Sequence, residues 1–204
     1  MAKARTSQIG KREEATEALL DAAERLLVAS GAASLTTRQV AAEAGLNHGL
    51  VHYYFGSIDN LVLAVGERFT DRLIARQRAM YGEDVPFREK WSKAMGYLGE
   101  DLAAGYPKVS AELAALARNN AELRKRVKRL NERWRAVLRE AFAKAIEEYG
   151  LDEREYPLDA LVSLVMTFNI GLQTESLLGI EKGHAELLAW IERWLVDLEK
   201  RAGR

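Results

Sequence analysis

Two histidines and a tyrosine, His48, His52 and Tyr53, occur close together at helical spacing. Residues four apart share one face of a helix, so both imidazoles would point the same way, with Tyr53 beside them. Imidazole and phenol groups can hydrogen-bond phosphates and base edges, and their ring carbons can pack on a thymine methyl group. Gly49 would permit a close approach of the backbone. Two histidines four residues apart can also bind a metal ion, but neither a third ligand nor an HExxH motif accompanies them, so no metal site is expected.

Two short helices around Gly45 would position these side chains. The predicted helices cover residues 37–44 and 48–55, with Thr36 and Asn47 as their N-caps and Gly45 as a left-handed C-cap. Apolar residues would pack the pair together: Val40, Ala41, Ala44, Leu46, Val51 and Phe55. The second helix would then present its histidines outward, which is the geometry of a helix-turn-helix that reads the DNA major groove. The alternative is a plain helical hairpin within a bundle.

The whole chain is predicted to be all-α, with about nine helices. Apolar spacing and turn residues predict longer helices at residues 11–29, 59–81, 86–103, 107–118, 121–149, 157–179 and 184–200. No run of alternating polar and apolar residues is long enough to predict a strand. We therefore expect a DNA-binding domain at residues 1–57 and a larger helical domain at residues 58–204.

Composition excludes several classes of protein. The chain has 204 residues, 30 basic and 30 acidic, and no cysteine. Disulfide frameworks, cysteine-based zinc sites, iron–sulfur clusters and cysteine nucleophiles are therefore ruled out. No secretory signal or membrane-spanning stretch is evident, which favours a cytoplasmic location. No phosphate-binding loop, GxSxG motif or metal triad is found, so we expect neither an enzyme nor a cofactor.

Charge is unevenly distributed along the neutral chain. Residues 1–12 contain four basic residues and no acid, whereas residues 13–24 contain five acids and no base. The acids would favour the N-terminus of the first helix. Residues 121–139 hold eight basic residues against two acids, which indicates a solvated helix face. A phosphate-bearing ligand such as an acyl-CoA is the alternative partner for that segment.

Over about residues 11–65 the sequence resembles the TetR family of bacterial transcriptional repressors. The family pattern is roughly L-T-T-x-x-I-A-x-x-A-G-V-S-x-G-x-x-Y-x-x-F, and this chain has Leu35-Thr-Thr-Arg-Gln-Val-Ala-Ala-Glu-Ala-Gly-Leu-Asn-His-Gly-Leu-Val-His-Tyr-Tyr-Phe. His52 stands where the family usually has tyrosine. Ile58 stands where it often has a phosphate-binding lysine, so that contact should be absent.

The resemblance implies a set of DNA contacts at matching positions. Thr36 and Thr37 fall at the phosphate backbone, and Arg38 can reach a phosphate or a base. On the recognition helix the matching residues are His48, Leu50, His52 and Tyr53, with Asn47 and Gly49 at its start. Basic side chains near the N-terminus, Arg5, Lys11 and Arg12, could replace the missing lysine.

The resemblance also implies partners for the helical body. It implies a homodimer through about residues 157–179 and 184–200, a palindromic double-stranded DNA operator, and a small, largely apolar effector. Polar Asn169 and Gln173 lie four apart on an otherwise apolar helix, and we expect them in the effector pocket. The other expected pocket residues are Trp91, Met95, Trp134, Leu138 and Phe168. These seven could equally be ordinary core residues, and a helical protein-interaction scaffold without DNA binding is the alternative function.

Overall fold

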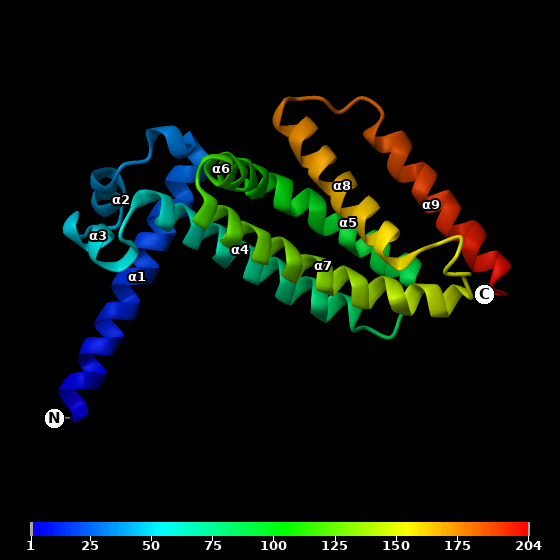
Figure 1. Ribbon diagram of the computed structural model, residues 1–204, viewed down its shortest axis with the longest axis horizontal. Helices are drawn as coiled ribbons and strands as arrows, with labels where there is room; N and C mark the ends of the chain where they lie inside the picture. Colours follow the sequence, from blue (N-terminus) through cyan, green and yellow to red (C-terminus); the bar gives the residue numbers. More distant parts are fainter. Residues whose placement is uncertain (1, 204) are drawn as a thin grey trace. The chain divides into compact units, whose positions relative to one another are not determined.

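The computed structural model describes the backbone of residues 2–203 and the side chains of residues 10–32 and 34–203. Within this part, nine α-helices and one short 3-10 helix follow one another and no strand occurs (Figure 1). The helices are α1 Ala2–Ser30, the 3-10 helix Ala32–Ser34, α2 Thr37–Glu43, α3 Gly49–Phe55, α4 Ile58–Tyr81, α5 Phe87–Ala103, α6 Tyr106–Asn119, α7 Ala121–Tyr149, α8 Leu158–Leu177 and α9 His184–Arg201. The all-α prediction is therefore confirmed.

Most helix boundaries agree with the sequence to within about two residues, and the start of the first helix differs most. The boundaries of α7 are those predicted from the sequence. Helix α1 begins at Ala2, about nine residues before the predicted start. Its acidic residues therefore lie in the middle of the helix, and the predicted stabilisation of an N-terminal turn is wrong. The 3-10 turn after Ser30 was also not predicted, because three residues show no periodicity.

The chain forms two compact units. Unit 1 runs to Phe69 and includes Lys108–Lys128, and unit 2 comprises Thr70–Pro107 and the residues from Arg129 onward. Helices α4 and α7 each contribute residues to both units. These units differ in content from the predicted domains 1–57 and 58–204, and that functional division remains a prediction.

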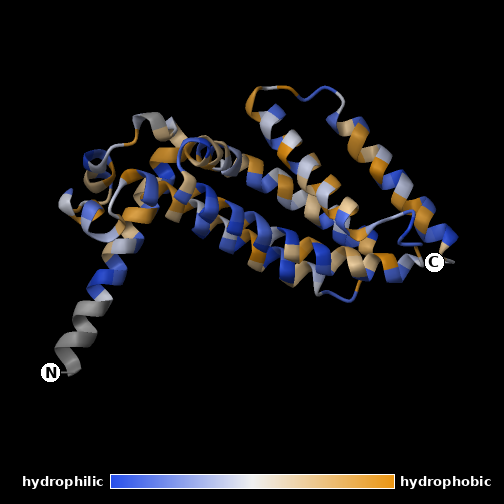
Figure 2. Ribbon diagram, in the orientation of Figure 1, coloured by the Kyte–Doolittle hydropathy of each residue, from blue (hydrophilic) through white to orange (hydrophobic). Residues whose placement is uncertain are grey.

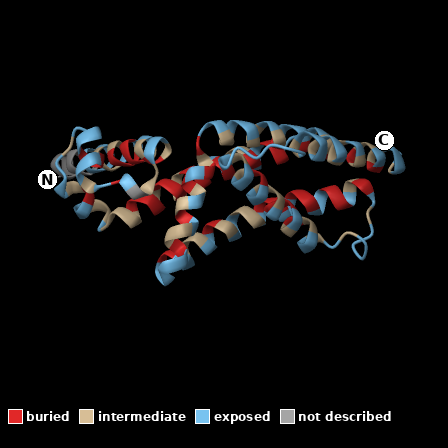
Figure 3. Ribbon diagram, turned by 90° about the horizontal axis from the view of Figure 1, so that it is seen from above, coloured by how far each residue is buried: buried red, intermediate tan, exposed pale blue. Residues whose placement is uncertain are grey.

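Unit 1 has its own apolar core. Residues buried in it come from five helices: Leu19, Ala22, Ala23 and Leu27 of α1, Val40 and Ala41 of α2, Val51 of α3, Leu61, Leu63 and Val65 of α4, and Val109 and Leu113 of α6. Figure 3 shows buried and exposed positions alternating along the helical ribbons. This core holds α2 and α3 against α1 and α4.

Unit 2 contains a larger, aromatic core. Phe87 lies at its centre, stacked on Tyr81 and in edge contact with Phe142 and Tyr149. Helices α8 and α9 form an antiparallel pair over this core (Figure 1). Among the described residues, no helix combines the length and apolar character needed to cross a membrane.

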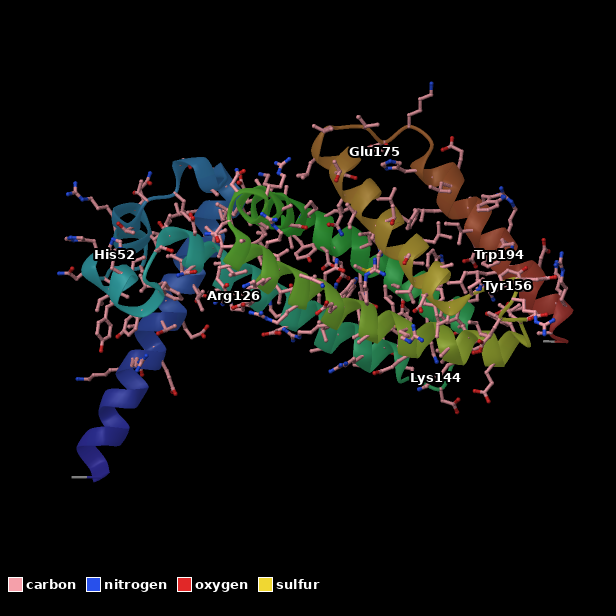
Figure 4. All side chains as sticks on the ribbon, in the orientation of Figure 1. His52, Arg126, Lys144, Tyr156, Glu175 and Trp194 are labelled. Atoms are coloured by element: carbon pink, nitrogen blue, oxygen red, sulfur yellow. The ribbon has the colours of Figure 1, made fainter. Side chains whose placement is uncertain are left out.

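The basic segment of α7 is engaged in ion pairs. Arg126 binds Glu67 in unit 1, with Nη2 2.8 Å from Oε1. In unit 2, Arg133 pairs with Asp71 and Arg139 with Asp159. Figure 2 shows how hydrophilic this part of α7 is, and Figure 4 labels Arg126 on it. These three cations therefore join α7 to neighbouring helices, and a phosphate-bearing ligand for the rest of this segment remains a prediction.

Candidate DNA-binding helix-turn-helix

The first turn of α2 is fixed by a reciprocal cap. The backbone N–H of Gln39 donates to Thr36 Oγ1 at 3.2 Å, and the N–H of Thr36 donates to Gln39 Oε1 at 3.1 Å. This capping box satisfies two backbone donors that a helix start would otherwise leave unpaired. The predicted N-cap is confirmed, and Arg38 is held in an exposed first turn with Thr36, while Thr37 is half-buried.

The turn between α2 and α3 requires a glycine. Gly45 has a φ of 67°, in the left-handed region that residues with a Cβ rarely adopt. The N–H of Leu46 then donates back to the carbonyl of Ala41 at 2.8 Å, which closes the helix end. Asn47 Oδ1 accepts the N–H of Gly49 at 2.9 Å. Because α3 begins at Gly49, its N-cap is His48, which makes no side-chain cap bond, and not the predicted Asn47.

One face of α3 is buried and the opposite face is open. Val51 is fully buried and Phe55 is half-buried. His48, Gly49 and His52 are exposed, Tyr53 has 73% of its surface exposed, and Leu50 is partly covered. The outward face predicted from the spacing is therefore present. Among the described residues, no group of three or more His, Asp or Glu side chains could hold a metal ion.

The ring of His52 is tied to the end of its own helix. Its Nδ1 lies 3.1 Å from the carbonyl oxygen of Gly56. A carbonyl only accepts hydrogen bonds, so Nδ1 must carry the proton in this contact. The side chain projects from α3 (Figure 4), and in the neutral ring Nε2 is left as an acceptor. Such an acceptor suits the amino group of adenine or cytosine in a major groove.

The DNA contacts expected of the basic residues of α1 remain a prediction. Lys11 and Arg12 are exposed, whereas the side chain of Arg5 lies outside the described residues. The Arg12 guanidinium lies 5.9 Å from the centre of the Tyr54 ring, which in turn makes an edge contact with Tyr53. Arg12 therefore lies close to α3, where a phosphate could also reach it. Ile58 begins α4 and provides no charge there, as expected.

Arg68 of α4 is a structural residue that the sequence did not reveal. Its guanidinium binds three carboxylates of α1, with Nη1 2.7 Å from Asp21 and 3.2 Å from Glu17, and with Nη2 on Glu24. The acids are spaced i, i+4 and i+7, which places them on one helix face. That spacing was a usable signal for a shared cation, but it could not identify which residue supplies the charge.

Unit 2 contains an apolar cavity of about 410 Å³. Its walls come from α5, the end of α7, the following linker, α8 and α9. The lining residues include Phe87, Trp91, Phe142, Tyr149, Leu161, Phe168, Trp190 and Trp194.

Two of the seven predicted pocket residues, Trp91 and Phe168, line this cavity, and their rings lie 6.3 Å apart. The other five do not line it. Leu138 is buried in the core, and Met95 and Trp134 pack against that core. Asn169 and Gln173 are half-buried. An effector role for these residues remains a prediction.

Comparison with known proteins shows which proteins the N-terminal segment is similar to. Residues 19–65 match the family model of the bacterial regulatory proteins of the tetR family. An HTH-type transcriptional regulator from the dhlA 5′ region of Xanthobacter autotrophicus is 41% identical over 64 residues, 31% of this chain and 32% of that protein. An HTH-type transcriptional repressor of Mycobacterium tuberculosis is 33% identical over 96 residues, 47% of this chain and 50% of that protein. The chain thus matches half or less of the length of these relatives.

Solved structures share the fold over nearly the whole chain. FadR of Bacillus subtilis, in complex with stearoyl-CoA, superimposes with a TM-score of 0.70 at 16% identity, covering 88% of this chain and 97% of FadR. A protein of Saccharomonospora viridis in complex with choline gives a TM-score of 0.67 at 19% identity, covering 92% and 96%. Over residues 19–65 this chain therefore carries the helix-turn-helix of the bacterial regulatory proteins of the tetR family, and beyond that segment the similarity is one of fold.

Proposed function

We propose that this chain is a DNA-binding transcriptional regulator, and specifically a repressor. The observation that carries the proposal is the exposed face of α3, with His48, His52 and Tyr53 held outward on a capped helix pair. Helices presented in this way enter the major groove and read base edges. One relative is named a transcriptional repressor, and this supports repression over activation.

The proposed regulator works as a homodimer. Helices α8 and α9 expose large apolar side chains, including Leu164 at 66%, Ile170 at 54% and Trp190 at 58%, and Leu178, directly after α8, is 70% exposed. An uncovered apolar surface of this kind marks an association site. Two copies related by a two-fold axis would present two α3 helices to a palindromic operator with half-sites about one helical turn apart.

A small apolar effector is proposed to control DNA binding. The 410 Å³ cavity of unit 2 is within the usual size range for small-molecule sites, about 300–1,000 Å³. The ligands of the two structural neighbours, stearoyl-CoA and choline, differ widely in chemistry, so the lining of this cavity is the better guide. An effector would release the operator only if it binds the DNA-incompetent conformation more tightly.

Selection of bound duplexes from a random library tests the proposal. We expect enrichment of a palindrome, and binding of that duplex should fall steeply with salt because phosphate contacts release counterions. Titration with a two-half-site duplex should give one dimer per site. If no sequence is enriched and no salt-dependent binding occurs, the DNA-binding function is wrong and the scaffold alternative is favoured.

A further inference from the structure

His52 and Gly56, at the end of α3, are joined by two hydrogen bonds. The N–H of Gly56 donates to the carbonyl of His52 at 3.0 Å, and His52 Nδ1 lies 3.1 Å from the carbonyl oxygen of Gly56. Asn60 of α4 holds the same turn, because its Nδ2 donates to the carbonyl of Phe55 at 3.0 Å. These contacts fix the position of the His52 ring and leave Nε2 as its free nitrogen.

The bond to the Gly56 carbonyl selects one tautomer of His52. A carbonyl oxygen only accepts, so the neutral ring carries its proton on Nδ1 and has an acceptor at Nε2. The side chain is exposed and projects from α3 (Figure 4), and Nε2 makes no hydrogen bond with a residue that the structure describes. His52 therefore offers an approaching molecule one acceptor and no donor.

The other two histidines of the chain are held differently. His48 is exposed on the same helix-turn-helix, and its side chain makes no cap hydrogen bond, so its ring can take either tautomer. His184 Nε2 lies 2.6 Å from a carboxylate oxygen of Glu175, which requires a proton on Nε2. Of the three histidines, His52 is the one whose contact places the proton on Nδ1.

A lone acceptor distinguishes the four bases in a major groove. Guanine presents two acceptors there, and thymine presents an acceptor beside a methyl group, so neither offers Nε2 a donor. Adenine presents an amino group, but its N7 acceptor lies next to it and would face a ring that has no donor. Cytosine presents its N4 amino group with no acceptor beside it. The ring therefore matches cytosine best, as do carboxylates, which are also acceptors without donors.

We propose that His52 is a specificity-determining residue that accepts a hydrogen bond from the N4 amino group of a cytosine in each operator half-site. The inference rests on the DNA-binding function proposed above and deepens it by naming the base. The Gly56 carbonyl is the positioning group, since it fixes the tautomer that makes this choice. The operator should therefore carry a C·G pair opposite His52, with cytosine on the strand that the ring contacts.

The first experiment compares the duplexes selected by the wild type, His52→Asn and His48→Asn. The amide nitrogen of asparagine can donate to the Gly56 carbonyl in place of Nδ1, whereas nothing replaces Nε2. The wild type and His48→Asn should enrich cytosine at one position of each half-site, and His52→Asn should lose that preference at that position alone. Hydrogen exchange of the Gly56 amide should be unchanged in His52→Asn, which shows that the turn is kept. An unchanged preference in His52→Asn, or another base at the His52-dependent position, overturns the inference.

A modified base tests the same contact on the unaltered protein. N4-methylcytosine still pairs with guanine, but its methyl group replaces the N4 hydrogen that faces the major groove. Placed at the His52-dependent position, it should lower the affinity of the wild type about tenfold, the usual size of one lost base contact. It should leave the affinity of His52→Asn unchanged. Equal losses in the two proteins would show that His52 does not receive this hydrogen bond.

Nitrogen NMR of the histidine rings tests the tautomer without DNA. In mildly alkaline solution, where imidazole is neutral, His52 should carry its proton on Nδ1 and His184 on Nε2. A proton on Nε2 of His52 overturns the inference whether or not an operator is found. If a palindrome is enriched and His52→Asn keeps every preference, this inference fails and the proposed regulator stands. If no sequence is enriched, the proposed regulator fails, and the base preference fails with it.

Discussion

Gly66 of α4 lies directly against Leu113 of α6, so closely that a Cβ on Gly66 would meet Leu113 Cδ1 at 2.2 Å. Both residues are buried in unit 1. The absence of a side chain at Gly66 therefore sets the distance between the two helices. Any side chain there must displace α6 or Leu113.

Gly66→Ala should lower the free energy of unfolding by about 1–3 kcal/mol, because overpacking outweighs the better helix propensity of alanine. Gly99→Ala is the matched control, since Gly99 is helical and exposed with open space around its Cβ position. It should raise stability by about 0.5–1 kcal/mol. Denaturant unfolding measures both changes. Similar effects of the two substitutions would mean that α4 and α6 do not approach as described.

Thr36→Ala should destabilise the helix-turn-helix by about 1 kcal/mol, because it removes one half of the capping box. Thr36→Ser keeps the hydroxyl and should retain most of that stability. Hydrogen exchange of the amides of α2 reports the loss locally. Equal exchange in Thr36→Ala and wild type would show that the cap contributes nothing.

Arg68→Met should destabilise unit 1, because the acids of α1 then face one another without their shared cation. Added salt should partly restore stability by screening that repulsion. Arg25→Met removes a single ion pair with Glu43, in which both side chains are exposed, and should cost at most about 1 kcal/mol. Thermal unfolding of both variants at low and high salt distinguishes the effect of Arg68→Met from that of Arg25→Met. A salt-independent loss in Arg68→Met would point to packing instead of charge.

Arg38→Ala should weaken operator binding and reduce the slope of log affinity against log salt by about 1, as expected for one lost phosphate contact. Tyr53→Ala should weaken binding without that change in slope, because a phenol carries no charge at neutral pH. Arg78→Ala removes an exposed cation from unit 2 and serves as the control. Unchanged binding by both the Arg38→Ala and the Tyr53→Ala variants would show that the DNA face is misassigned.

Stability should fall at alkaline pH because of Tyr149. Burial, with the nearby carboxylates of Glu199 and Glu148, raises the pKa of Tyr149 to about 12. In the unfolded chain this phenol loses its proton near its ordinary pKa of about 10. Between these values the unfolded state binds fewer protons, so the free energy of unfolding decreases as pH rises. The urea concentration at the midpoint of unfolding, measured between these two pH values, should decline less steeply in Tyr149→Phe than in the wild type. An equal decline in both proteins would contradict the raised pKa of Tyr149.

Local features of the fold could be predicted from the sequence, and long-range partners could not. Thr36, Gly45 and Asn47 act on residues within five positions, so the capping box of α2, the left-handed turn and the Asn47 hydrogen bond follow from local residue type. The spacing of α3 likewise predicts which side is buried. The partner of the α1 acids, Arg68, is more than forty residues away in the chain. The apolar cavity of unit 2 depends on where α9 packs against α5 and α8, and helical periodicity does not specify which helices become neighbours.

The hydrogen bond between the His52 ring and the Gly56 carbonyl has a consequence for redesign of the operator preference. One nitrogen of the imidazole completes the last turn of α3, so only the other is available to a nucleobase. Replacing His52 to recognise a different base pair would also loosen the helix that carries it. In the proposed regulator a change at residue 56 could not compensate, because the acceptor is a backbone carbonyl and Gly56 has a φ of 76°, which favours glycine. Single-site libraries at His52 should therefore yield weak binders more often than retargeted ones.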